Sequence, residues 1–395
     1  MKRPANDLTR PSRPGIMLVA VEPSGDALGA SLLRELRKIA PPGARYFGCG
    51  GLLMAAEGME SLFPIDNLSV MGLTDVIRVL PEGLTRAREL AEVAEREAVD
   101  AVIFIDGWAF SRVTAQKMKR RGLRAKLFKL AAPQVWASRP GRVDFVKRHF
   151  DGVLCLLPFE PPYFQKAGIR AAFMGNPNFQ SAWAGRGDGA RFRARHGLGT
   201  APLLAVLPGS RRGEIRHHLT PFRGAVSLLA ERVPGLRVVA VLPPQVESFA
   251  RPRMARWPGD PIFAAPEEKA GAFAAADVGL AKSGTVTTEL AINRTPMVVA
   301  YKVDPLTAIW ARSVMTGKFV TVLNIAAGRE LIPELIQERC RPEILAADLL
   351  ALLTDEEARL EQLEAFPRLL AYLGVDGPPA AKLGAEKLAG WMRWV

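Results

Sequence analysis

The chain has 395 residues, of which 49% are hydrophobic and 24% charged, a balance typical of a soluble globular protein with about two domains and not of a disordered or fibrous chain. Its three cysteines, Cys49, Cys155 and Cys340, are an odd number at wide spacing, which argues against a disulfide framework or a zinc site and favours a reducing compartment. The formal net charge is +13, and neither a membrane-spanning apolar run nor a signal peptide is visible, so the sequence predicts a cytoplasmic protein.

The first half of the chain alternates short apolar runs with helical patterns, after a polar head at residues 1–15 that we expect to be disordered. Strands are predicted at 16–21, 45–50, 101–106, 125–130, 152–157 and 171–175. Helices are predicted at 26–39, 82–98, 110–121 and 159–167. Strands separated by helices are typical of a parallel sheet covered on both faces, so residues 16–181 are predicted to form an N-terminal Rossmann-like domain.

The positive charge is concentrated within this first domain. Residues 111–149 include 12 lysines and arginines but one acid, Asp144, and so supply most of the net charge. The stretch is either a solvated face or a surface for an anionic partner such as an acidic membrane, where each cation contributes roughly 1 kcal/mol. No nucleic-acid motif accompanies it, so nucleic acid is not expected to be the partner.

The strand pattern begins again after a Gly- and Arg-rich segment, residues 182–202, that we expect to be a linker. Strands are predicted at 203–209, 236–243, 261–266, 278–284, 296–301 and 319–324. Residues 203–340 are therefore predicted to form a second Rossmann-like domain. Residues 341–395 are predicted to be helices that either pack back on the N-terminal domain or exchange between the subunits of a homodimer. The predicted fold is α/β, with two doubly wound domains facing each other across a cleft and ligands at the carboxyl ends of the strands.

Two turns in the second domain have the composition of a phosphate site. The first, Gly209-Ser210-Arg211, follows a predicted strand and leads into a helical run. Backbone N–H groups at a helix start can bind phosphate, and Arg211 adds a planar fork that can bind a diphosphate through two N–H groups. Taken alone, such a turn is more often a helix cap with a surface arginine.

The second turn repeats the strand–turn–helix pattern. Ser283, Gly284 and Thr285 can offer hydroxyl and backbone N–H groups to a phosphate. Glu289 lies about one turn into the helix, where it either accepts hydrogen bonds from two ribose hydroxyls or is a solvated helical glutamate. Two helix starts that can bind an anion, together with a carboxylate in the same doubly wound domain, predict a site for a nucleoside diphosphate.

A third segment contributes weaker candidates, Asn324, Arg329 and Glu330, which could bind the nucleotide or close over its phosphates. The chain has no G-x-x-x-x-G-K-[ST] loop, and its first strand is not followed by G-x-G-x-x-G. Phosphoryl transfer through a phosphate-binding loop and simple dinucleotide binding are therefore not expected.

Eight stretches, taken in order, form a recognisable set: 22–30, 68–72, 105–106, 133–137, 157–160, 207–214, 283–289 and 328–331. Together they resemble the lipid-A-disaccharide synthase family, inverting glycosyltransferases of the two-Rossmann (GT-B) type. The resemblance runs from about residue 17 to residue 338. No single stretch is specific, but the set in this order is.

The resemblance implies transfer of 2,3-diacylglucosamine from UDP-2,3-diacylglucosamine to 2,3-diacylglucosamine 1-phosphate with inversion, which forms the β-1,6 lipid A disaccharide and releases UDP. Asp106 matches the family's catalytic aspartate, and its place at a strand end suits a base for the acceptor hydroxyl; its alternative role is a helix cap. Arg211 and the two helix starts are expected to offset the charge of the leaving UDP, without a metal or a cofactor. The matching stretches place further residues on the acceptor side: Ser24, Gly25, Asp26, Met71, Gln134 and Trp136.

The departures from the family pattern fall on the acceptor side, at Val21, Gly107, Trp108, Ala109, Ser138 and Asn176. They leave the predicted UDP site intact and keep three alternatives open. The chain could be a transferase for a different acylated acceptor, a UDP-sugar epimerase on the same fold, or a catalytically silent relative that binds a UDP-sugar.

Substrates with acyl chains require contact with a membrane surface. Residues 68–80 are strongly apolar and form either a core helix or an exposed lip that dips into the membrane interface beside the basic stretch, because apolar and cationic contacts reinforce each other. We therefore expect a cytoplasmic enzyme peripherally associated with the anionic inner-membrane surface, without an anchor.

Overall fold

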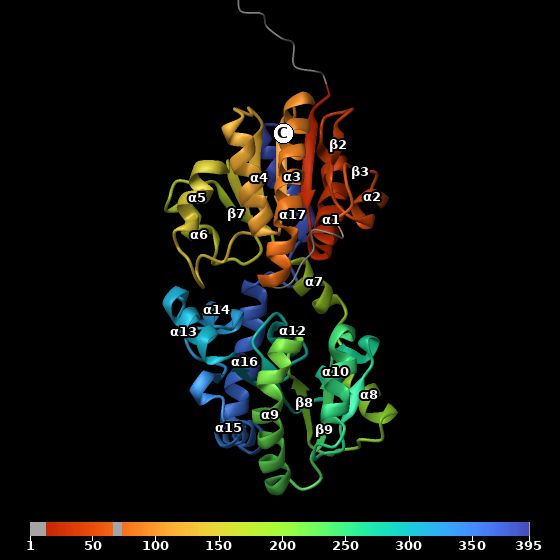
Figure 1. Ribbon diagram of the computed structural model, residues 1–395. Coiled ribbons are helices and arrows are strands. Elements are labelled where there is room, and N and C mark those ends of the chain that lie inside the picture. The colour runs from red at the N-terminus through yellow and green to blue at the C-terminus, as the bar shows by residue number, and fades with distance from the viewer. Residues whose placement is uncertain (1–12, 66–72, 395) are drawn as a thin grey trace, which may run out of the picture. The chain divides into compact units, whose positions relative to one another are not determined.

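The computed structural model describes residues 13–65 and 73–394, with residues 73–79 described for their backbone only. The chain divides into two compact units, the first made of Met1–Pro177 and Pro378–Val395 and the second of Asn178–Gly377. In each unit helices flank a parallel β-sheet (Figure 1). The protein is therefore α/β with two Rossmann-like domains, which confirms the predicted fold class.

The first unit contains a seven-stranded sheet in the order β3-β2-β1-β4-β5-β6-β7. Its strands are β1 (Gly15–Ala20), β2 (Arg45–Cys49), β3 (Glu60–Ser61), β4 (Ala101–Ile105), β5 (Lys126–Leu130), β6 (Gly152–Cys155) and β7 (Ala171–Phe173). Its helices are α1 (Pro23–Ile39), α2 (Leu52–Ala56), α3 (Leu73–Arg96), α4 (Trp108–Arg120), α5 (Arg142–His149), α6 (Pro161–Gln165) and α17 (Ala380–Met392). The sequence predictions missed β3, α2 and α5, which are short.

The strands of this sheet are apolar at successive positions because helices cover both of its faces. Along β1 the side chains alternate between the two faces, as the period of a strand requires. Met17 joins a core with Leu90 of α3 and Met118 of α4, whereas Leu18 packs with Leu32 of α1 on the opposite face.

The last helix, α17, belongs to the first unit. Its residues Ala385 and Leu388 lie in the core that α1 also lines. Trp391 stacks on Phe128 of β5, with ring centroids 5.8 Å apart. A Cβ on Gly384 would lie 2.9 Å from the Cε atom of Met174, so glycine at this position allows the close approach. The two preceding helices, α15 (Pro342–Thr354) and α16 (Glu356–Tyr372), remain in the second unit.

The second unit contains a six-stranded sheet in the order β10-β9-β8-β11-β12-β13. Its strands are β8 (Leu203–Leu207), β9 (Arg237–Val241), β10 (Ile262–Ala264), β11 (Val278–Lys282), β12 (Met297–Tyr301) and β13 (Glu334–Ile336). Before α15 and α16 its helices are α8 (Gly189–Arg195), α9 (Arg212–Arg232), α10 (Pro244–Met254), α11 (Lys269–Ala275), α12 (Val286–Ile292), α13 (Pro305–Val314) and α14 (Val322–Ala327), and α7 (Pro177–Ala184) joins the units.

The strand predicted at 319–324 is wrong. Thr321 instead caps α14, because its side chain accepts a hydrogen bond from the backbone N–H of Asn324 at 3.2 Å. The place beside β12 is taken by β13. β-branched residues favour a strand on propensity, and here a local cap overrides that preference.

The segment predicted as a linker, 182–202, contains the end of α7 and the whole of α8. Its glycines allow close packing of α8 on α11. A Cβ on Gly187 would lie 2.0 Å from the carbonyl oxygen of Ala270, and one on Gly189 would lie 2.4 Å from that of Ala274. The division between the units falls earlier, between Pro177 and Asn178.

Both sheets contain a switch point, where the chain's direction of winding reverses. It lies between β1 and β4 in the first sheet and between β8 and β11 in the second. In doubly wound sheets the loops after these strands open a crevice that binds ligands. No helix in the described part of the chain has both the length and the apolar character needed to cross a membrane.

Candidate functional site

A cavity of about 330 Å³ lies at the switch point of the second unit. Loops that follow β8, β9, β10 and β11 contribute to its wall. Six residues predicted for UDP binding line it together: Gly209, Ser210, Ser283, Gly284, Thr285 and Glu289. The fold thus brings the two predicted turns to one space of ligand size.

The first turn is shaped by Gly209 and by a carboxylate on the helix that follows. Gly209 has φ +127°, a conformation that favours glycine. The backbone N–H of Ser210 donates to Glu214 Oε2 at 3.2 Å, which folds the turn onto the first turn of α9. Arg211 extends from the same turn with its side chain 66% exposed, 3.6 Å from Glu214 Oε1, and it does not line the cavity.

Lys282 is a cation of this site to which the sequence reasoning assigned no role. Its Nζ lies 3.1 Å from Glu214 Oε1, and both side chains are largely shielded from solvent. Burial alone would raise the pKa of Glu214, but the Lys282 ammonium, the Ser210 N–H and Arg211 hold that pKa below its ordinary value. In the sequence the available signal was a charged lysine at the end of an apolar strand. Its partner could not be read from the sequence, because Glu214 lies on a different element, the first turn of α9.

The second turn offers backbone donors to the cavity. The Ser283 hydroxyl donates to the Val320 carbonyl at 3.2 Å. Among the described residues, no acceptor lies within hydrogen-bond reach of the backbone N–H groups of Gly284 and Thr285. A Cβ on Gly284 would meet only Lys282 Nζ, at 3.9 Å, so the turn is open on the cavity side. Free N–H groups beside a lysine suit an anionic ligand.

Glu289, predicted to bind ribose, forms an ion pair within the cavity. Its Oε2 lies 2.5 Å from Nζ of Lys269, and both residues line the wall. Lys269, at the start of α11, was not predicted to take part. A ribose hydroxyl bound by Glu289 would share that carboxylate with Lys269.

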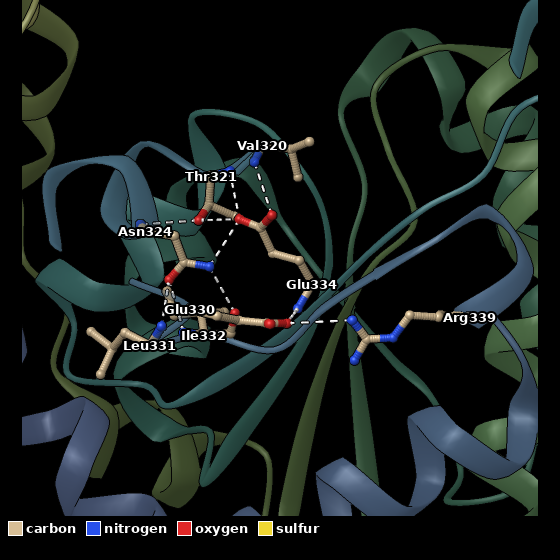
Figure 2. A network of polar contacts seen from close by, with 8 residues as sticks. All are labelled: Val320, Thr321, Asn324, Glu330, Leu331, Ile332, Glu334 and Arg339. Atoms are coloured by element: carbon tan, nitrogen blue, oxygen red, sulfur yellow. Dashed lines mark hydrogen bonds and ion pairs between the residues drawn. The ribbon is translucent and has the colours of Figure 1, made fainter. Parts of the chain in front are cut away.

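The structure corrects the role expected of Asn324, because its side chain is fully buried and holds a loop together (Figure 2). Its amide nitrogen donates to the Ile332 carbonyl at 2.8 Å and to Glu334 Oε1 at 2.9 Å. Its amide oxygen accepts from the backbone N–H groups of Leu331 and Ile332, both at 2.9 Å. Both polar atoms of the Asn324 side chain are therefore engaged within the protein, and neither is left to bind a nucleotide.

Arg329 and Glu330 also lie outside the cavity wall. Arg329 forms an exposed ion pair with Glu361 of α16. Glu330 accepts a hydrogen bond from the backbone N–H of Glu334 at 3.1 Å and lies 3.6 Å from Arg339 (Figure 2). The structure therefore places both in the support of the loop before β13.

His218 supports the first turn from beneath. The fully buried imidazole has Nδ1 at 3.1 Å from the Pro208 carbonyl, and Nε2 accepts from the backbone N–H of Lys302 at 3.0 Å. Burial lowers its pKa to about 4, so the ring is neutral near pH 7. The structure makes this histidine a clamp between the loops after β8 and β12.

A second cavity of about 490 Å³ adjoins the first, since Lys282 and Ser283 line both. Its other walls include Val303, Ala308 and Met315, from the segment that contains α13. The same segment exposes several large apolar side chains: Leu306 is 80% exposed, Ile309 65% and Trp310 53%. An acyl chain suits such a surface better than a sugar does.

Asp106 lies at the switch point of the first unit, directly after β4. Its φ of +52° is in the left-handed region, which a non-glycine residue adopts only when its surroundings hold it there. Two buried groups do so, since its carbonyl accepts from Lys129 Nζ at 2.6 Å and from the Ser111 hydroxyl at 2.9 Å. Its Oδ2 accepts from the Ser24 hydroxyl at 3.1 Å. The carboxylate is thus presented by a constrained backbone.

Lys129 is a further residue that the sequence reasoning missed, although a lysine in a buried apolar strand was a visible signal. Burial lowers the pKa of its ammonium to about 7, against the attraction of Asp106 and Glu22, which raises it. Besides Asp106 it donates to the Leu130 carbonyl at 2.8 Å. It therefore supports the left-handed turn that carries Asp106.

Of the other residues predicted for the acceptor side, Gly25 and Asp26 have structural roles. Gly25 lets α1 approach β4, because a Cβ there would lie 3.3 Å from the Ile105 carbonyl. Asp26 is buried and accepts from the backbone N–H groups of Gly51, Leu53 and Met54, so the structure assigns it to capping α2 and not to a ligand.

Gln134 is exposed, and the Trp136 indole donates to Glu160 at 3.0 Å. Met71 lies outside the described residues, as do residues 68–72 of the predicted lip at 68–80. Its residues 73–80 belong to α3, described over 73–79 for the backbone only, so the lip stays a prediction. Among the described residues no three His, Cys, Asp or Glu side chains are grouped to hold a metal ion.

The fold and the paired turns define the class as a two-Rossmann protein of the GT-B type. Solved structures with this fold include the Staphylococcus aureus MnaA–UDP co-structure, with a TM-score of 0.64, 11% identity and coverage of 97% of this chain and 98% of that chain. Another is CalG4, the calicheamicin glycosyltransferase, with a TM-score of 0.56, 17% identity and coverage of 96% and 98%. At such identities the likeness shows the fold alone.

Residues 16–369 match the family model described as lipid-A-disaccharide synthetase. The lipid-A-disaccharide synthase of Paramagnetospirillum magneticum is 41% identical over 383 residues, covering 96% of this chain and 97% of the relative. That of Rhodospirillum centenum is 39% identical over 373 residues, covering 94% and 93%. The chain belongs to the lipid-A-disaccharide synthetase family and is a disaccharide-forming glycosyltransferase. The resemblance drawn from the motifs is confirmed, and the epimerase and silent-relative alternatives are not favoured.

Proposed function

We propose that this enzyme transfers 2,3-diacylglucosamine from UDP-2,3-diacylglucosamine to 2,3-diacylglucosamine 1-phosphate with inversion, forming the β-1,6 disaccharide and releasing UDP. The observation that carries the proposal is the cavity of about 330 Å³, where two strand–turn–helix segments meet. Two segments of this kind, with lysines and open backbone N–H groups, suit a pyrophosphate joined to a nucleoside.

The proposed donor site combines residues from both turns. Gly209 and Ser210 on one side and Ser283, Gly284 and Thr285 on the other bind the pyrophosphate, and Lys282 supplies a positive charge. Glu289 accepts from the ribose hydroxyls. These are the residues that share the wall of the cavity, which supports their joint assignment.

In the proposed chemistry, Asp106 takes the proton of the acceptor hydroxyl as that oxygen bonds to the anomeric carbon and UDP departs. A carboxylate in a constrained backbone costs little reorganisation during the reaction. Arg211, exposed at the start of α9, approaches the pyrophosphate as its negative charge grows. A charged donor of this kind is typically worth ~3 kcal/mol in the transition state.

The proposed substrates carry acyl chains, and the second cavity and the exposed apolar residues of α13 support a place for them. The cavity of about 490 Å³ adjoins the donor site through Lys282 and Ser283, and Val303, Ala308 and Met315 make part of its wall apolar, so acyl chains on the donor sugar have a space beside the pyrophosphate. We propose that Leu306, Ile309 and Trp310 contact a membrane interface, as apolar and aromatic side chains at a lipid surface do, and that the enzyme associates peripherally with an anionic membrane.

The test is Asp106→Asn, which keeps the shape of the side chain and removes the base. We expect kcat to fall by a factor on the order of 10² to 10⁴, with UDP affinity unchanged because UDP is bound by the second unit. Asp376→Asn, at an exposed aspartate, is the matched control and should keep wild-type kcat. Wild-type turnover by Asp106→Asn would remove Asp106 from the mechanism.

A further inference from the structure

A cavity of about 560 Å³ in the first unit is lined largely by arginines. It lies between the start of α4 and the segment that contains α5, and Arg112, Arg139, Arg142 and Arg148 contribute to its wall. No acidic residue is among the residues that line it. Arg112, Arg139 and Arg148 are exposed and Arg142 is half-buried, so this positively charged wall is open to a ligand from solution.

Two aromatic rings hold two of these guanidinium groups in place. Trp108 and Phe145, which also line the cavity, contact each other edge to face with centroids 5.7 Å apart. The guanidinium carbon of Arg142 lies 5.5 Å from the Trp108 ring centroid, and that of Arg112 lies 5.5 Å from the Phe145 centroid. Stacking on an aromatic face attracts a guanidinium and leaves its N–H edge free to bind a ligand.

The charges of the cavity repel one another. Burial is the largest cause that lowers the pKa of Arg142, and the neighbouring charges of Arg139 and Arg112 lower that pKa further. In the described part of the chain, Arg112, Arg142 and Arg148 have no carboxylate within ion-pair distance. The nearest acid in the sequence, Asp144, is exposed and meets Arg148 only through its backbone carbonyl, which accepts from Nε at 3.2 Å. An anion in the cavity would relieve this repulsion.

We propose that this arginine cavity binds a phosphate monoester, the 1-phosphate of the acceptor sugar. The proposal rests on the proposed function, which supplies that acceptor. A monoester carries close to two negative charges and presents three oxygens, so it can engage several guanidinium groups through paired hydrogen bonds. A single negative charge would leave most of the positive charge of this wall uncompensated.

The cavity lies close in the chain to the proposed base. Helix α4 begins at Trp108, and Asp106 is bound to its first turn through the Ser111 hydroxyl, which donates to the Asp106 carbonyl at 2.9 Å. The reacting 6-hydroxyl and the 1-phosphate of the acceptor flank the same ring oxygen, because C6 is attached to C5 and both C5 and C1 bond to that oxygen. A phosphate held at the start of α4 would therefore leave the hydroxyl within reach of Asp106.

The kinetic test compares Arg112→Gln and Arg142→Gln with Arg120→Gln. Arg120 is an exposed arginine at the far end of α4 that does not line the cavity, so it controls for the loss of one charge. Each cavity variant should raise KM for the acceptor about 10-fold or more, the usual effect of losing a hydrogen bond between two charged groups. KM for the donor and the affinity for UDP should stay at wild-type values. An acceptor KM that is unchanged in both cavity variants would overturn the proposal.

Two binding measurements separate the sources of a phosphate group. Titration calorimetry with soluble glucosamine 1-phosphate should show binding to the wild type and to Arg120→Gln and weaker binding to Arg142→Gln. Vesicles with phosphatidic acid or phosphatidylglycerol in phosphatidylcholine should bind all three proteins alike. Loss of phosphatidic acid binding with an unchanged acceptor KM would assign the cavity to a membrane headgroup and overturn our assignment.

The same measurements distinguish this proposal from the proposed function. A wild-type protein that binds glucosamine 1-phosphate through Arg142 but forms no disaccharide would support the phosphate site and contradict the function. A wild-type protein that forms disaccharide while Arg112→Gln and Arg142→Gln keep wild-type acceptor KM would contradict the phosphate site alone.

Discussion

Lys282→Met removes a cation shared by the donor cavity and a neighbouring carboxylate. At 3.1 Å from Glu214 Oε1, and at an effective dielectric constant of about 20, two unit charges attract by roughly 5 kcal/mol. A bound pyrophosphate would compete for the same ammonium. Losing one hydrogen bond between charged groups costs about 1.5–3 kcal/mol, so UDP affinity should fall about 10- to 100-fold.

The carboxylate left behind adds a second effect. Glu214 in Lys282→Met keeps its negative charge near the turn that binds phosphate, so it should repel UDP. Glu214→Gln in the same background should therefore recover part of the lost affinity, which makes the two substitutions non-additive. Titration calorimetry with UDP on the wild type, both single variants and the double variant measures this coupling.

Lys318→Met is the matched control, because Lys318 is exposed in the same unit and lines neither cavity. It should bind UDP as the wild type does. Melting curves identify any loss of folded protein in Lys282→Met, since loss of the lysine partner of Glu214 is expected to destabilise the unit. A folded Lys282→Met with wild-type UDP affinity would refute the placement of the pyrophosphate in this cavity.

Three further predictions concern the residues around this site. Arg211→Ala should lower kcat by a factor on the order of 100 to 1,000 with an unchanged melting temperature, and near-normal turnover would remove Arg211 from the mechanism. Asn324→Ala should lower the free energy of unfolding by about 3 kcal/mol or more, because it breaks four buried hydrogen bonds. The UDP affinity of the folded fraction should change less than threefold, and a loss of UDP binding would restore Asn324 to the nucleotide site. Burial lowers the pKa of His218 to about 4 in the folded protein, so the unfolded chain binds the proton more tightly and acidification from about pH 6.5 to 4 should destabilise the protein. Melting temperatures over this range should fall less in His218→Gln than in the wild type, and an equal dependence on pH would contradict the clamp.

Most of the sheet strands could be predicted because both faces of each sheet are buried and the strand is a continuous apolar run. The short strands β3 and β13 were not predicted. The two turns of the donor site could be predicted for a related reason, since a turn such as Gly209, with its positive φ, follows directly after such a strand. The sequence did not distinguish a strand at 319–324 from a helix start, because Thr321 acts as a cap only if the residues after it form a helix, as they do in α14.

The buried lysines show the limit of sequence reasoning about the site. Lys129 and Lys282 are visible as cations at the ends of apolar runs, but the sequence does not say which groups they meet. Their partners lie on other elements, since Asp106 follows β4 and Glu214 is in the first turn of α9. Only the order of strands in each sheet brings them together.

The basic stretch shows the same limit for charge. In the sequence, residues 111–149 form a run with no obvious division between surface and site. In the fold, four of these arginines line one cavity, beside the contact between Trp108 and Phe145. The exposed apolar side chains of α13 were missed because their run reads as an ordinary amphipathic helix.

The central claim is that this chain joins two acylated glucosamines. The most direct measurement incubates the purified protein with UDP-2,3-diacylglucosamine and 2,3-diacylglucosamine 1-phosphate and determines the linkage of the product by NMR. We expect a β-1,6 disaccharide 1-phosphate and one UDP released per linkage formed. An α linkage, an epimerised UDP-sugar, or UDP release without a disaccharide would contradict it.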